Sequence, residues 1–136
     1  MNDYDYRPQL ASNTDLKETV KRMLKAEGYE FNEYASLGDY RIDFVAWKLD
    51  VQEHIIITVA VEAADLTMVG RILALLGRYR EEKNPNARAW IIARDFTSGA
   101  WDAAKVCPDL TLKWYQASVS IIDAQKFTVT PQPAQE

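Results

Sequence analysis

Two acidic residues stand inside β-rich, otherwise apolar runs of the sequence, and their types allow metal chemistry. Asp43 lies within the run 40–47, and Glu62 closes the run 54–62. A carboxylate is costly to bury among Val and Ile unless it binds a cation or a hydrogen-bond donor. If the two runs form neighbouring strands, both carboxylates can share one ion. The pattern therefore predicts a hard-cation site formed by Asp43 and Glu62.

The elements that must position these acids follow an α/β order. Periodicity and turn residues predict helices at 14–27, 65–83 and 97–106, and strands at 29–34, 40–47, 54–62, 88–93, 110–115, 118–122 and 127–129, with a turn at 35–38. The run Ile55–Val61 is almost continuously apolar, which is typical of a strand covered on both faces. We therefore expect a central mixed β-sheet of about five strands flanked by helices, in the order αβββαβαβ.

Length and composition indicate one ordinary globular domain. The chain has 136 residues, of which 48% are hydrophobic and 26% charged. We expect a single domain over 1–136, with a core at about 14–122 and loosely ordered tails at 1–12 and 130–136. No run approaches the roughly 20 apolar residues of a membrane helix. The single cysteine and the acidic N-terminus agree with a cytoplasmic protein.

The net charge of −4 counts against tight nonspecific DNA binding, because a dedicated nucleic-acid binder usually carries a basic surplus. A local basic patch remains compatible with this total. Of the aromatic residues that could stack on bases, Trp101 is the one expected to be exposed, since it falls on the short helix at 97–106 rather than in a strand.

The order of elements, with an acid in each of two consecutive strands, resembles the PD-(D/E)XK nuclease superfamily and its restriction-endonuclease-like fold. Members carry Asp near the start of one strand, Glu-x-Lys at the end of the next, and then a helix that often bears Gln. The segments that resemble these elements and the strand after them are 38–44, 59–64, 69–76 and 90–96. The similarity covers roughly residues 14–115.

This resemblance implies a Mg²⁺ or Mn²⁺ site in which Asp43 and Glu62 are metal ligands and the carbonyl of Ala63 adds a third oxygen. Hard cations suit such an oxygen set and keep several waters, one of which could attack a phosphodiester. DNA is the implied substrate of such an endodeoxyribonuclease, and a homodimer is common among related folds. Glu18 would be an accessory acid if the first helix faces the site.

Two positions depart from the family pattern. Ala64 stands where the lysine of Glu-x-Lys is expected, and it has neither a donor nor a charge. Loss of one such electrostatic group typically costs about 10²–10³ in rate. Arg71 stands where the helix often bears Gln, and it could bind phosphate more readily than activate a water, since arginine stays charged. The expected function is therefore a nuclease-fold protein that binds or processes DNA, with metal-dependent hydrolysis weakened or lost.

Other interpretations of the same residues remain open. Asp43 could pair with Arg41 or with a backbone amide, and Glu62 could be an ordinary solvated strand end. The chain as a whole could be a non-enzymatic protein-interaction or regulatory module on this fold. It could also be an active nuclease in which Arg71 replaces the lysine.

Overall fold

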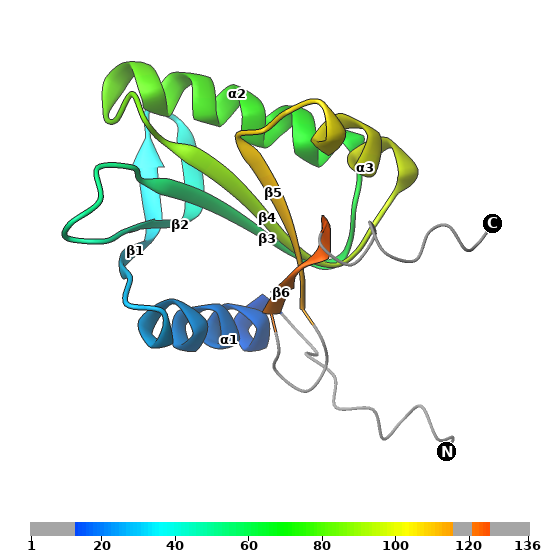
Figure 1. The fold of residues 1–136 in the computed structure, drawn as a ribbon, viewed down its shortest axis with the longest axis horizontal. Helices are drawn as coiled ribbons and strands as arrows, with labels where there is room; N and C mark the ends of the chain where they lie inside the picture. Colours follow the sequence, from blue (N-terminus) through cyan, green and yellow to red (C-terminus); the bar gives the residue numbers. More distant parts are fainter. Residues whose placement is uncertain (1–12, 116–120, 126–136) are drawn as a thin grey trace.

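The computed structural model of the protein describes residues 13–115 and 121–125 (Figure 1). The described elements are, in order, α1 (Asn13–Ala26), β1 (Glu30–Leu37), β2 (Tyr40–Trp47), β3 (Ile55–Ala64), α2 (Leu66–Glu82), β4 (Arg88–Phe96), α3 (Ser98–Lys105), β5 (Leu110–Tyr115) and β6 (Ile121–Asp123). None of these helices combines the length and the apolar content needed to cross a membrane.

The strands form one mixed sheet in the order β1-β2-β3-β4-β5-β6. The pairs β3–β4 and β4–β5 are parallel, and the other three pairs are antiparallel. The predicted α/β class and mixed sheet are confirmed. The expected count of about five strands was low, because Ile121–Asp123 pairs with β5 as a sixth strand. The strand predicted at 127–129 lies outside the described residues.

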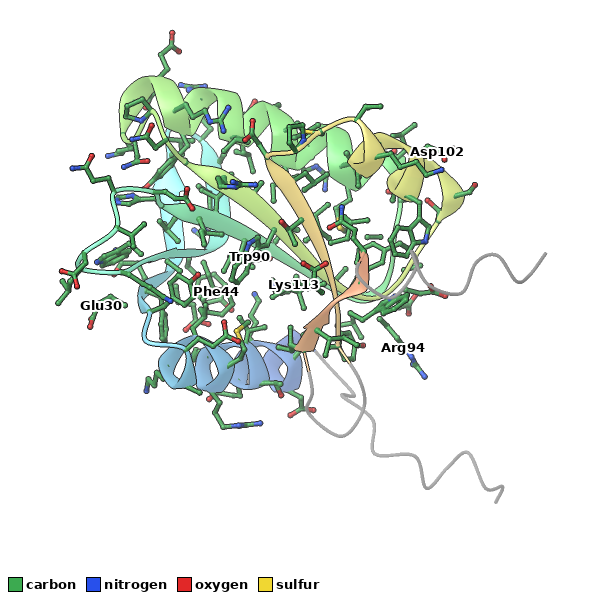
Figure 2. The ribbon with its side chains drawn as sticks, in the orientation of Figure 1. Glu30, Phe44, Trp90, Arg94, Asp102 and Lys113 are labelled. Atoms are coloured by element: carbon green, nitrogen blue, oxygen red, sulfur yellow. The ribbon has the colours of Figure 1, made fainter. Side chains whose placement is uncertain are left out.

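Helices cover both faces of the sheet (Figure 1). On one face, Leu16, Val20 and Leu24 form the apolar stripe of α1 and are fully buried. They belong to one core cluster with Phe44 and Trp90, whose side chains point from the sheet toward α1 (Figure 2). Removal of this surface from water stabilises the layer by about 25 cal/mol per Å² of apolar area buried.

The opposite face packs against α2 and α3. The buried residues of α2 recur at helical spacing and are Val69, Ile72, Leu75, Leu76 and Tyr79. The carboxylate of Asp65 accepts the N–H of Met68 at 3.0 Å and so caps the start of α2. The hydroxyl of Thr97 accepts the N–H of Ala100 at 3.3 Å at the start of α3. These caps fix the two crossovers that join the parallel strands.

The predicted end of β1 was wrong. The sequence predicted a turn at 35–38, whereas β1 continues to Leu37, with Gly38 (φ +62°) at the tight turn into β2. Tyr34 adopts a left-handed conformation with φ +59° where the prediction ended the strand, and pairing resumes beyond it between Ala35 and Ile42. A bulky residue with positive φ is a genuine outlier, and no local sequence pattern announces it.

Candidate functional site

Asp43 lies where β2 and β3 part. The ladder between these strands contains only three pairs and ends at Phe44–Ile57. Beyond it, Oδ2 of Asp43 accepts the N–H of Val59 at 2.9 Å. The carboxylate thus takes the place of a β2 carbonyl, which would accept this hydrogen bond if the ladder continued. The N–H of Val59 therefore keeps a hydrogen-bond partner. The alternative in which Asp43 pairs with a backbone amide is confirmed, and the interaction anchors the carboxylate at the fork.

A lysine from α1 completes the surroundings of Asp43. Nζ of Lys17 lies 3.5 Å from Oδ1 of Asp43 and donates a hydrogen bond to the Tyr34 hydroxyl at 3.0 Å. Partial burial opposes the charge of Lys17, but the hydrogen bond to Tyr34 and the charge of Asp43 outweigh that effect, so the pKa of Lys17 is raised above its ordinary value of 10.5. The ammonium is therefore charged at neutral pH.

Sequence reasoning did not single out Lys17. Its position beside Leu16, on the flank of the apolar stripe of α1, was the available signal. A lysine at such a position can lay its stem on the sheet and carry its charge to a group on a neighbouring strand.

Glu62 lies near the C-terminal end of β3, at an irregularity in the sheet. The pairing of β3 with β4 shifts register between Ala60 and Ala63, and both Glu62 and Ala63 are exposed. The Tyr115 hydroxyl donates a hydrogen bond to the carbonyl of Val61, which ties this irregular backbone to β5. Glu62 itself makes no hydrogen bond or ion pair within 13–115 and 121–125.

A second cation lies within electrostatic reach of this end of β3. Burial raises the pKa of Tyr115, the charge of Arg94 opposes this shift, and the charge of Glu62 adds to it. Both Glu62 and Arg94 are therefore near the same phenol. Arg94 is exposed near the end of β4 and projects away from the ribbon (Figure 2).

The donor chemistry of the predicted metal ligands fits a hard cation. Asp43 contacts Val59, and Glu62 stands three residues further along the same strand, which is about 10 Å of extended chain. No group of three or more His, Cys, Asp or Glu side chains is near enough to hold a metal in the described part of the chain. Mg²⁺ is commonly held by only one or two carboxylates together with waters and a substrate phosphate. The shared site of Asp43, Glu62 and the Ala63 carbonyl stays a prediction.

Ala64 and Arg71, the two departures from the motif, both lie on the side of the sheet that packs against α2. Ala64 is completely buried in the core cluster under α2, and its carbonyl accepts the N–H of Thr97. Arg71 is exposed on α2, which covers the face of the sheet opposite α1 (Figure 1), and it makes no hydrogen bond or ion pair with any described residue. A phosphate contact from Arg71 stays a prediction.

Two further candidates have partners of their own. Glu18 lies on α1 with its side chain 55% exposed, and it pairs with Lys21 at 3.0 Å. The expectation of an exposed Trp101 was wrong: its ring is half-buried and packs edge-to-face on Phe96 and Trp114.

The sequence of this chain matches a known protein family. A family model described as restriction endonuclease matches residues 9–128. The chain belongs to this restriction endonuclease family. It has the PD-(D/E)XK nuclease-like fold of DNA-processing nucleases, which typically use divalent metals. No match is found among curated proteins.

Solved structures agree with this family on the fold. A repair endonuclease from Pyrococcus abyssi matches with a TM-score of 0.67 and 16% identity, over 78% of this chain and 47% of that one. A complex of EndoMS with double-stranded DNA matches with a TM-score of 0.61 and 14% identity, over 74% of this chain and 44% of that one. The chain thus spans about half the length of these proteins.

Proposed function

We propose that this restriction endonuclease family member binds the phosphodiester backbone of DNA at the end of the sheet that carries Asp43 and Glu62. The observation that carries the proposal is the Asp43 carboxylate, fixed by Val59 at the fork between two strands in a nuclease fold. The EndoMS relative of this fold is described in complex with double-stranded DNA, which supports DNA as the partner.

The proposal assigns Mg²⁺ or Mn²⁺ to the oxygens of Asp43, Glu62 and Ala63. Such an ion, when bound, steadies the negative charge of a phosphate and lowers the pKa of a bound water. Two of the lone pairs of the Asp43 carboxylate face Val59 and Lys17, and a carboxylate offers about four, so further ligation stays open. Glu62 is exposed and has no competing hydrogen bond within the described ranges.

The proposal also holds that metal-dependent hydrolysis of phosphodiesters at this site is weak or lost. The position that resembles the motif lysine holds Ala64, which is buried and has no donor. The absence of one preorganised electrostatic group typically costs about 10²–10³ in rate. A buried Ala64 also favours the second candidate, a non-enzymatic interaction module on the same fold. Homodimerisation and a protein partner stay predictions.

The test uses plasmid DNA and a short duplex with the wild-type chain and three variants, in EDTA, Mg²⁺ and Mn²⁺. Asp43→Asn and Glu62→Gln remove the two carboxylates. Glu30→Gln is the matched control, because Glu30 is an exposed glutamate at the start of β1, where it pairs with Trp47 at the end of β2 rather than with the Asp43 region (Figure 2). Cleavage and gel retention are measured together.

Three outcomes separate the candidates. Slow metal-dependent cleavage that disappears in Asp43→Asn and Glu62→Gln but survives in Glu30→Gln supports a nuclease. Salt-sensitive retention without cleavage supports a binding-only protein. Neither retention nor cleavage at low salt, in any of the three buffers, overturns the DNA proposal in favour of the interaction module.

A further inference from the structure

Lys17 is held unusually firmly for a helix lysine. Its side chain is only 12% exposed, and its ammonium lies between the carboxylate of Asp43 and the hydroxyl of Tyr34. The same Nζ also lies 4.3 Å from the centre of the Tyr34 ring, which is within the range of a cation–π contact. Two side chains from two strands thus converge on one ammonium.

The backbone of the sheet is distorted where these groups meet. Pairing between β1 and β2 joins Glu33 to Phe44 and then Ala35 to Ile42, so Tyr34 and Asp43 drop out of the ladder. Tyr34 is the one non-glycine residue with positive φ in the described part of the chain. Such strain persists only where surrounding contacts over-determine it, and it is found preferentially at binding sites.

The ammonium has capacity for a further oxygen. A lysine offers three N–H groups, and the described contacts of Lys17 use two, one toward Tyr34 and one toward Asp43. The side chain of Asp43 is 25% exposed, so solvent reaches the pair. A charged donor with one unused N–H beside a fixed carboxylate is suited to a non-bridging phosphate oxygen.

The other cations expected near the site do not fill this role. Arg71 has no contact with Asp43 and lies on the opposite face, and a side chain at position 64 starts inside the core. Lys21, one turn along α1 from Lys17, is already paired with Glu18 at 3.0 Å and with Glu33 at 2.7 Å. Lys17 is thus the cation in direct contact with Asp43 among the residues that the structure describes.

From this convergence we infer that Lys17 is a phosphate-binding residue of the Asp43 site, supplied by α1, and that Tyr34 positions it. The inference rests on the proposed DNA function and names the residue that makes the phosphate contact. At this end of the sheet, an anionic backbone meets the negative charges of Asp43 and Glu62. Lys17 supplies the compensating charge there.

The test measures duplex affinity as a function of salt for Lys17→Gln, Lys17→Arg and the matched control Lys21→Gln. Each phosphate contact contributes about 0.9 to the slope of log K against log salt. We expect Lys17→Gln to reduce the slope by about 0.9 and to weaken binding roughly five- to tenfold at 0.1 M salt. Lys17→Arg should keep the wild-type slope, and so should Lys21→Gln.

A measurement on the wild-type chain keeps the test independent of variant folding. With ¹³Cε-labelled lysine, a duplex titration should shift the Lys17 resonance and leave that of Lys21 in place. Tyr34→Phe, which keeps the ring and removes the hydroxyl, should weaken the binding less than Lys17→Gln.

The outcomes also separate this inference from the function beneath it. If the wild type does not retain DNA, the proposed function and the inference fall together. If it retains DNA but Lys17→Gln keeps the full slope, or if Lys21→Gln loses as much, the Lys17 assignment alone is overturned.

Discussion

Substitution of Ala64 by lysine tests why the ammonium at this site would come from α1. Ala64 is completely buried in the cluster that β3 forms with α2, and Phe96 and Ala100 belong to the same cluster. The exposed neighbour Ala63 provides a matched control one residue away. We expect Ala64→Lys to destabilise the fold strongly and Ala63→Lys to leave it nearly unchanged.

The expected magnitude has two parts. Insertion of three methylenes into a packed core costs about 1–3 kcal/mol. A buried ammonium lowers its pKa by up to about 3–5 units, and each unit is about 1.4 kcal/mol, so partial burial adds about 2–4 kcal/mol. The sum of about 3–7 kcal/mol is a large share of the 5–15 kcal/mol typical of a domain. At about 3–4 °C per kcal/mol, Ala64→Lys should melt about 10–30 °C below the wild type.

Thermal and urea unfolding followed by circular dichroism measure the effect. Ala64→Met isolates the packing cost, and the excess of Ala64→Lys over Ala64→Met gives the cost of the charge. That excess should shrink as the pH rises from the lowered pKa of the folded lysine toward about 10.4, the pKa of the unfolded lysine, and should vanish above that value. An Ala64→Lys variant that melts within about 2 °C of Ala63→Lys would refute the reasoning, because position 64 would then be open to a lysine from β3.

Three further predictions concern stability. Asp43→Ala should lower the free energy of unfolding, measured with urea, by about 1–3 kcal/mol, because it leaves the Val59 N–H without its acceptor. Asp43→Asn should lower it less, because the amide oxygen can still accept that hydrogen bond. Equal losses in the two variants would contradict this role of the Asp43 carboxylate. Asp65→Ala should lower the free energy of unfolding by about 1 kcal/mol, because it removes the N-terminal cap of α2. Asp102→Ala removes an exposed ion pair and should change that free energy by less than about 0.5 kcal/mol. A larger loss for Asp102→Ala than for Asp65→Ala would count against the stabilising role of the cap. Burial raises the pKa of Tyr79 above its ordinary value of 10.0, so its contribution is present below pH 10 and is lost as the pH rises through the folded pKa. Urea unfolding between pH 9 and 11.5 should therefore show a decline in stability that is shallower in Tyr79→Phe, and an identical decline would exclude this source.

Local sequence patterns predicted the elements whose signals are local. The predicted strands at 40–47 and 110–115 agree with β2 and β5 at both ends, because apolar alternation and turn residues mark them directly. The end of β1 depended on the backbone conformation of Tyr34, a residue whose side chain contacts Lys17 of α1. Pairing of β6 with β5 is likewise a tertiary event that no single window of sequence contains.

The candidate site divides in the same way. Asp43 was found from its residue type in an apolar strand, since a buried carboxylate demands a partner. Its partner Lys17 was missed because the two residues are 26 positions apart in the sequence and meet only when α1 packs on the sheet. A sequence reveals which group needs a counter-charge more readily than which distant residue supplies it.

Local charge, rather than the net charge of −4, decides whether this end of the sheet can meet a phosphate backbone. Asp43 and Glu62 alone would repel DNA. Lys17 of α1 contacts Asp43. Arg94 of β4 and Glu62 both act electrostatically on the Tyr115 hydroxyl. Because the Debye length at physiological salt is about 8 Å, a phosphate at the fork experiences these neighbouring cations more strongly than the distant acidic surface. The proposed DNA binding is therefore compatible with an acidic protein, and under that proposal the affinity would depend on two cations from separate elements.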